Sequence, residues 1–106
     1  MIGHNSSGAS KAGLAVYDQA GLPMISPTST STSLSSKVFV RTVPSDAAAG
    51  KKLANYAYND WIDNVVIFYN PKSAYSKSLK ETFEKNFNNL GGEVFWSIDL
   101  QGLSNQ

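Results

Sequence analysis

The chain has 106 residues, of which 42% are hydrophobic and 16% are charged, and its formal net charge is +1. This size and composition fit one small globular unit, and the low net charge gives no support to nucleic acid as a partner. The absence of cysteine excludes disulfides, thiolate catalysis and cysteine-based zinc sites.

The N-terminal sequence and the apolar runs of the chain bear on its location. Residues 1–8 contain neither a basic segment nor an apolar core of the kind found in signal peptides. The longest apolar run, residues 65–69, has the length of a strand and is far too short to cross a bilayer. We therefore expect no export signal in this chain and no transmembrane segment.

The first part of the chain predicts a strand end, a helix and a second strand. Residues 1–3 have the composition of a strand terminus, and the hydroxyl-rich turn 5–8 can cap a helix. The helix is predicted over 9–20 and ends before Gly21. Residues 22–26 then predict a short buried strand. The apolar stripe of the helix is formed by Ala9, Ala12, Val16 and Ala20.

Residues 28–36 consist almost entirely of serine and threonine, with Leu34 as the exception. Such low complexity is compatible with a disordered linker. Apolar segments typical of strands lie close on both sides, however. We therefore predict an ordered loop.

The second part of the chain predicts two strand–helix units. Residues 38–43 favour a strand, and Ser45 is a suitable N-cap for a helix that runs to about Asn59. The continuous apolar run 65–69 is typical of a central parallel strand that is covered on both faces. A final strand is predicted over 93–100.

Apolar residues at helical spacing mark the expected inner faces of the two helices in this part. In the first helix they are Ala49, Leu53, Tyr56 and Ala57. In the second they are Tyr75, Leu79, Phe83, Phe87 and Leu90. The alternation of strands and helices predicts an α/β fold with a mostly parallel sheet and flanking helices.

The sequence lacks the residue combinations that catalysis or metal binding would need. His4 is the single histidine and has neither cysteine nor a carboxylate pair beside it, so it predicts no metal site and no triad. Walker loops, dinucleotide fingerprints and strong nucleophile–base pairs are absent. We expect a protein that is not an enzyme and needs no cofactor; a small flavodoxin-like hydrolase or phosphatase is the enzymatic alternative.

Three segments that follow strands are candidates for contact with a small molecule. Amides at the helix N-terminus near Ser7, together with the neighbouring hydroxyls, suit a carboxylate or a phosphate. Thr28, Ser29 and Thr30 follow the next strand, at the strand ends where open α/β sheets bind ligands. Tyr75 begins a later helix and could cover a ligand. For each segment a purely structural role stays open, as a cap, a polar loop or a core aromatic.

The order and spacing of four segments resemble type I periplasmic solute-binding proteins of the leucine/isoleucine/valine-binding kind. Residues 2–10 look like the "IGH-x-x-S" turn of that family, and residues 17–30 look like its "Y-x-x-x-G-[ILV]-x-x-I-S-P-x-x-T" segment. Residues 39–46 are similar to the "F-R-T-x-P-x-D" crossover between its two lobes. Residues 66–76 look like the first strand and loop of its second lobe.

The resemblance implies a partial type I fold, in which two flavodoxin-like lobes enclose a ligand cleft. Residues 1–42 would belong to the first lobe and residues 43–106 would begin the second. We expect an internal fragment of a periplasmic or extracellular receptor for amino acids or similar small polar solutes, which feeds an ABC-type importer through its membrane permease. The alternatives are the sensor domain of a signalling receptor, such as a receptor kinase, and a non-functional remnant that self-associates through exposed strand edges.

The resemblance also implies roles for the candidate residues. Ser7 would meet the carboxylate of the ligand, and the loop with Thr28, Ser29 and Thr30 would hold the amino-acid head group. Tyr75 would cover the ligand when the lobes close. Thr28 and Ser29 are more polar than the alanine-rich version of branched-chain receptors, which permits a polar ligand. The carboxylate that pairs with the ammonium group of the ligand is expected from outside this chain.

Overall fold

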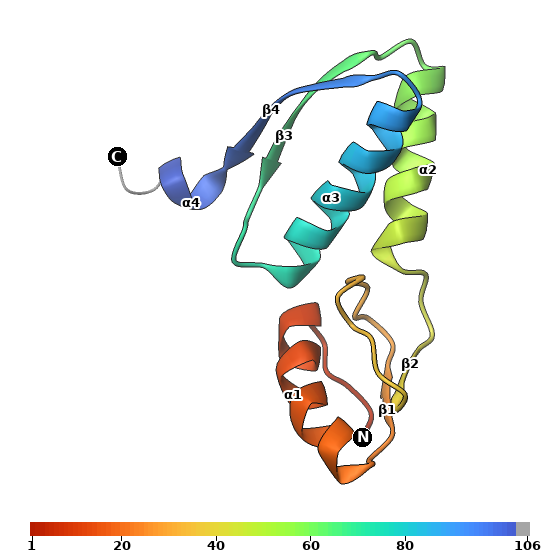
Figure 1. Ribbon diagram of the computed structural model, residues 1–106, viewed down its shortest axis with the longest axis vertical. Helices are drawn as coiled ribbons and strands as arrows, with labels where there is room; N and C mark the ends of the chain where they lie inside the picture. Colours follow the sequence, from red (N-terminus) through yellow and green to blue (C-terminus); the bar gives the residue numbers. More distant parts are fainter. Residues whose placement is uncertain (104–106) are drawn as a thin grey trace.

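A computed structural model of the chain describes residues 1–103, in which strands and helices alternate along most of the length (Figure 1). The elements are α1 (Ser7–Ala20), β1 (Met24–Ser26), β2 (Phe39–Arg41), α2 (Asp46–Asn59), β3 (Asn64–Tyr69), α3 (Ala74–Asn89), β4 (Glu93–Asp99) and α4 (Leu100–Leu103). Strand β1 pairs with β2 and β3 pairs with β4, both in parallel. The predicted α/β class is therefore confirmed for the described residues.

Local chemistry sets the ends of α1. The Ser6 hydroxyl accepts a hydrogen bond from the Ala9 amide at 3.2 Å, which caps the first turn. The helix ends at Gly21, whose φ of +65° is a left-handed conformation that glycine adopts readily. Ile2 forms a parallel bridge with Ile25, so the first residues lie beside β1 as the predicted strand end.

The serine- and threonine-rich segment between β1 and β2 is an ordered loop, as predicted. Ser29, Ser31 and Leu34 are buried in it. The amides of Thr28 and Ser29 both donate to the Ser26 hydroxyl, at 3.3 and 3.1 Å, which turns the chain directly after β1. The ordering thus comes from side-chain hydrogen bonds that replace the ladder of regular secondary structure.

Helices α2 and α3 lie side by side and pack closely, with the β3–β4 pair next to them (Figure 1). Gly50 allows this approach, because a Cβ at that position would collide with the Thr82 side chain and lie 2.8 Å from the Phe83 amide nitrogen. Ala54 of α2 and Phe87 of α3 are fully buried in this part of the chain.

The predicted helix bounds agree with the structure, but two of the predicted faces are wrong. The apolar stripe of α1 faces solvent, and the helix instead buries Ser7, Ser10 and Leu14. Helix α2 buries Asp46, Gly50 and Ala54, whereas most of its predicted inner face is exposed. Small residues are buried in both helices because they permit close contact with α3 or with the loop, and apolar periodicity does not detect such contacts.

Strand β3 is not the doubly covered central strand that its sequence predicts. It pairs on one side only, with β4, and Val66 and Phe68 are exposed on one face. The register is Val65 with Val94 and then Val66 with Trp96, so β4 contains one extra residue at this point. A groove of about 440 Å³ runs between β3 and the two helices, and its lining includes Leu53, Leu79 and Phe83.

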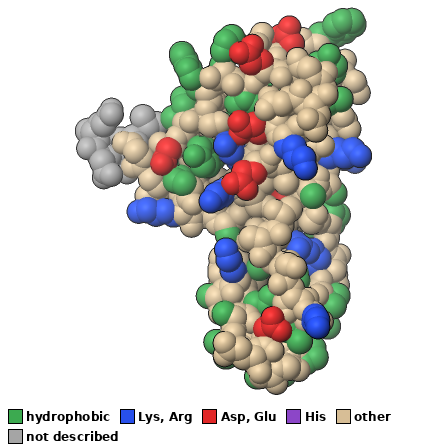
Figure 2. Space-filling view, in the orientation of Figure 1, with side chains coloured by type: hydrophobic (Ala, Val, Ile, Leu, Met, Phe, Trp, Pro, Cys, Tyr) green, Lys and Arg blue, Asp and Glu red, His purple; other side chains and the backbone are tan. Residues whose placement is uncertain are grey.

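The whole chain is flat and extended. Its dimensions are 47 × 36 × 17 Å and its radius of gyration is 15.7 Å, against about 13 Å for a compact domain of this length. Basic and acidic side chains are interspersed on the visible face, without a concentrated patch of one sign (Figure 2). No helix within residues 1–103 is long and apolar enough to cross a bilayer. The predicted second lobe includes residues 104–106, which lie outside the described part.

Candidate functional site

Three helices begin close to the loop that joins β1 and β2. The N-terminal ends of α1, α2 and α3 all point toward the region between the lower part of the molecule (α1, β1 and β2) and the upper part (α2, α3, β3 and β4) (Figure 1). We call this region the junction. Each helix N-terminus carries partial positive charge and amides without intrahelical partners. The junction is therefore suited to hold a negatively charged group.

Ser7 links α1 to this loop. Its hydroxyl oxygen accepts hydrogen bonds from the amides of Thr30 and Ser31, at 3.2 and 3.1 Å. Ser7 is buried by these contacts. Two predicted site residues, Ser7 and Thr30, are thus in direct contact although 22 residues separate them in the sequence.

Thr28 and Ser29 use their hydroxyls to fasten the loop to the turn that precedes α1. The Ser29 hydroxyl donates to the His4 carbonyl at 3.0 Å and lies 2.6 Å from the Ser10 hydroxyl. The Thr28 hydroxyl donates to the Asn5 carbonyl at 2.6 Å. These two residues therefore brace the site through hydroxyls that already have partners inside the chain.

Thr30 and Asp46 present the two buried side-chain polar atoms that lack a hydrogen-bond partner within the described residues. They are Thr30 Oγ1 and Asp46 Oδ2. The Asp46 amide donates to the Thr30 carbonyl at 2.8 Å, so the two residues are neighbours at the start of α2. Asp46 is only 1% exposed, and no ion pair to it forms within residues 1–103. A buried carboxylate is costly unless a donor or cation reaches it.

The sequence places Asp46 in the crossover-like segment 39–46 and directly after the predicted N-cap Ser45, and this position was not predicted as a site residue. The signal that could have found it was its place at the end of the "F-R-T-x-P-x-D" resemblance. Its burial depends on the loop and on α3, which are remote in the sequence.

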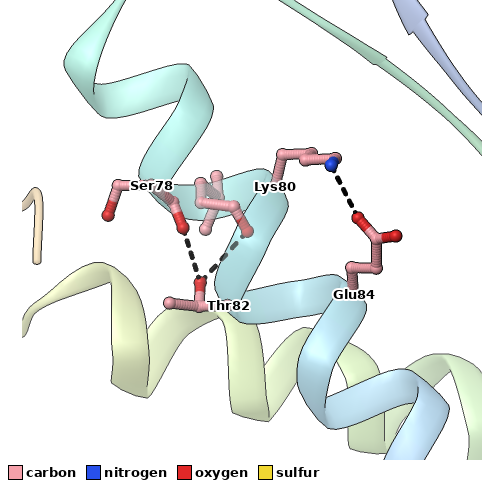
Figure 3. Close-up of polar contacts among 5 residues, drawn as sticks. Ser78, Lys80, Thr82 and Glu84 are labelled. Atoms are coloured by element: carbon pink, nitrogen blue, oxygen red, sulfur yellow. Dashed lines mark hydrogen bonds and ion pairs between the residues drawn. The ribbon is translucent and has the colours of Figure 1, made fainter.

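Helix α3 contributes hydroxyls to the same region. Ser78 accepts a hydrogen bond from the Thr32 amide at 2.9 Å, which ties the loop to α3. The Thr82 hydroxyl lies 2.9 Å from the Asp46 carbonyl. It is also within hydrogen-bond reach of two carbonyls of its own helix, as Figure 3 shows. Loop, α2 and α3 are therefore joined by hydroxyl contacts around Asp46.

Helix α3 also carries an ion pair between Lys80 and Glu84 at 2.8 Å (Figure 3), on the side where Lys80 lies over the Tyr69 ring of β3. The hydrogen bond to Glu84 raises the pKa of Lys80 above its ordinary value. Within residues 1–103, no side-chain hydrogen bond links this ion pair to Asp46. No group of three or more potential metal ligands occurs within residues 1–103.

No hydrogen bond or ring contact joins Tyr75 to the other predicted site residues within residues 1–103. It lies in the first turn of α3, is 49% exposed, and lines the apolar groove beside Phe68 and Leu79. The structure therefore brings Ser7, Thr28, Ser29 and Thr30 together and leaves Tyr75 at the mouth of the groove.

The sequence matches the model of the periplasmic binding protein family over residues 1–105. The chain belongs to this family. Its members and the similar solved structures are binding proteins, which confirms the prediction that the chain is not an enzyme. No curated protein matches the sequence significantly.

Several solved structures share the fold. An ABC transporter substrate-binding protein from Desulfitobacterium hafniense, in complex with Leu, is 32% identical with a TM-score of 0.80, over 98% of this chain and 33% of that one. A leucine-binding protein from Thermotoga maritima is 28% identical with a TM-score of 0.83, over 92% and 29%. This chain therefore spans about a third of the length of the structures it matches.

A solute-binding protein from Rhodopseudomonas palustris, in complex with 3,4-dihydroxybenzoic acid, is 21% identical with a TM-score of 0.80, over 92% of this chain and 27% of that one. At this identity the match supports the fold alone. Together the matches confirm the predicted partial type I fold.

Proposed function

We propose that the chain forms one wall of a solute-binding cleft and that the solute is an amino acid. The observation that carries this proposal is the pair of buried, unpartnered oxygens, Thr30 Oγ1 and Asp46 Oδ2, beside a cluster of helix N-termini. The family supports solute binding, and two of the similar structures are described as leucine-bound or leucine-binding. The ligand contacts below rest on the geometry of this chain.

An amino acid presents a carboxylate and an ammonium group, and the junction offers partners of both kinds. The amides at the start of α1, near Ser7, are suited to the carboxylate. The oxygens of Thr30 and Asp46 are suited to the ammonium group, which has three donors and needs acceptors. Asp46 thus provides within the chain a carboxylate that the sequence led us to expect from outside it.

Other parts of the proposal follow from the family architecture. Residues 1–42 would end the first lobe and residues 43–106 would begin the second, with the junction at the cleft. Thr28 and Ser29 would brace the head-group loop, and Tyr75 would cover the ligand on closure. The intact protein would act in the periplasm and deliver its solute to the membrane permease of an ABC importer.

A comparison of three ligands tests the proposal. L-leucine carries both charged groups, 4-methylpentanoate lacks the ammonium group, and 3-methylbutylamine lacks the carboxylate. We expect L-leucine to raise the melting temperature of the chain more than either analogue, because ligand binding to the folded state stabilises it. The Asp46→Asn variant should respond to L-leucine no more than to 4-methylpentanoate.

The matched control is Asp60→Asn, which removes the same charge at the exposed C-terminal end of α2. This variant should retain the wild-type order of the three ligands. Equal responses of the wild-type chain to L-leucine and 4-methylpentanoate would contradict the assignment of Asp46, and no response to L-leucine would contradict the proposed function.

A further inference from the structure

We infer that Arg41 is a positioning residue that sets the shape of the head-group loop. This inference rests on the proposed function, because the loop contains Thr30. The Arg41 guanidinium donates through Nη1 to the carbonyls of Ser29 and Ser31, at 3.3 and 3.1 Å, and through Nη2 to the Leu34 carbonyl at 3.3 Å. One side chain therefore spans most of the loop.

The two Nη1 contacts flank Thr30 directly. The Ser29 carbonyl shares a peptide plane with the Thr30 amide, so fixing this carbonyl fixes the plane that precedes Thr30, and the Ser31 carbonyl fixes the plane that follows Ser31. The direction of the Thr30 amide, toward Ser7, depends on the first of these planes, and the Thr30 carbonyl, which accepts from the Asp46 amide, lies between the two. Arg41 thus acts on the site through the backbone and has no need to touch the ligand.

Arg41 is itself held by a regular element. It is the last residue of β2, in register with Ser26 of β1, and its guanidinium carbon lies 5.1 Å from the centre of the Phe39 ring. The loop has no ladder of its own, and ordering each of its residues costs about 1–2 kcal/mol of backbone entropy. A donor fork fixed on a strand offsets part of that cost and gives three loop carbonyls a charged donor.

The geometry assigns the role to the planar fork and not to the positive charge alone. A lysine at this position would keep the charge, but its single ammonium group on a flexible stem cannot reproduce the fork that meets three carbonyls. Arg41→Lys and Arg41→Met should therefore have similar effects on the loop. The matched control is Lys37→Met, which removes one positive charge from an exposed position four residues earlier.

Amide hydrogen exchange, measured by NMR, tests the inference without any ligand. The amides of Thr30 and Ser31 report on the attachment of the loop to α1, because both donate to the Ser7 hydroxyl. In Arg41→Met and Arg41→Lys we expect their exchange to rise about tenfold or more, since three hydrogen bonds from a charged donor are lost or weakened. Exchange within α2 and α3 should stay unchanged, and Lys37→Met should match the wild-type chain.

Ligand response provides the readout that a purely structural role would not change. The L-leucine-induced rise in melting temperature should fall in both Arg41 variants, while melting without ligand stays cooperative. Wild-type exchange at Thr30 and Ser31 in Arg41→Met would overturn the inference, as would an equal rise of exchange in all helices. If Arg41→Lys shows the exchange rates of the wild-type chain, the effect belongs to the positive charge, and the role assigned to the planar fork is wrong. If L-leucine does not stabilise the wild-type chain, the proposed function fails and the exchange result still decides the role of Arg41.

Discussion

Serine hydroxyls provide the packing around the turn that precedes α1. Ser10, Ser26 and Ser29 are fully buried, and their hydroxyl oxygens lie 3.3, 2.9 and 3.0 Å from the His4 carbonyl oxygen. Buried hydroxyls are tolerated because each has a partner. The first part of the chain is thus held by hydrogen bonds of fixed geometry, which suits a site that must present amides and oxygens in one direction.

Gly50 provides a prediction at the scale of one residue. Alanine normally stabilises a helix by up to about 1 kcal/mol relative to glycine. In Gly50→Ala the new methyl group would instead press on Thr82 and the Phe83 amide. We expect this variant to lose about 1–3 kcal/mol of unfolding free energy in urea denaturation, the usual cost of overpacking.

Gly8 offers the matched control, because a Cβ there meets no atom within 4 Å. Gly8→Ala should leave the unfolding free energy unchanged or raise it. A Gly50→Ala variant that is as stable as Gly8→Ala would show that α2 and α3 do not approach as closely as described.

Some site residues could be predicted from the sequence and others could not, and the difference lies in the kind of contact that positions each residue. Ser7 and Thr30 were predictable as neighbours, because both follow strands whose carboxyl ends meet at one edge of a sheet. Asp46 and Arg41 were not, because their positions depend on burial by α3 and on carbonyls of an irregular loop. Neither kind of contact leaves a periodic pattern in the sequence.

The helices were predictable in extent, but the buried faces of α1 and α2 were not. Caps are local, so Ser6 and Gly21 mark the ends of α1 reliably. The face that a helix buries is set by partners that are remote in the sequence. In α2 the buried residues are Asp46, Gly50 and Ala54. A row of small residues packs helices closely, but it contributes nothing to an apolar stripe.

Strand β3 combines an unpaired edge with exposed apolar side chains. Its sequence has no charge and no proline, β4 pairs with it on one side only, and Phe68 is 60% exposed. An edge of this kind favours pairing with another chain. We therefore propose that the isolated chain self-associates through β3.

A charge on that strand should suppress the association. Val66 is 43% exposed on β3, so Val66→Lys places a charge on the edge strand without burying it. In sedimentation velocity the wild-type chain should show an average mass that rises with concentration, and Val66→Lys should lower it toward the monomer.

Val16→Lys is the matched control, because Val16 is 64% exposed on α1, which lies in the other part of the molecule from β3 (Figure 1). It should associate as the wild-type chain does. A wild-type chain that stays monomeric at all concentrations, or an equal effect of both lysines, would argue against association through β3.

At the scale of the whole molecule, the order of elements was predictable and the coverage of the sheet was not. Alternating strand and helix patterns are encoded locally, whereas the apolar run in β3 has the composition of a strand buried on both faces. In this chain the strand borders an open groove. The chain spans about a third of the length of the structures it matches, so its apolar pattern is that of a larger fold.

The central claim is that the junction, and not the apolar groove, takes the solute. The most direct measurement is an NMR titration of the labelled chain with L-leucine, in which the backbone amide shifts are mapped onto the structure. The account predicts that the shifts change at Ser7, Thr30 and Asp46, at the N-terminal ends of α1 and α2. Changes confined to Leu79 and Phe83 in the groove, or no changes at all, would contradict it.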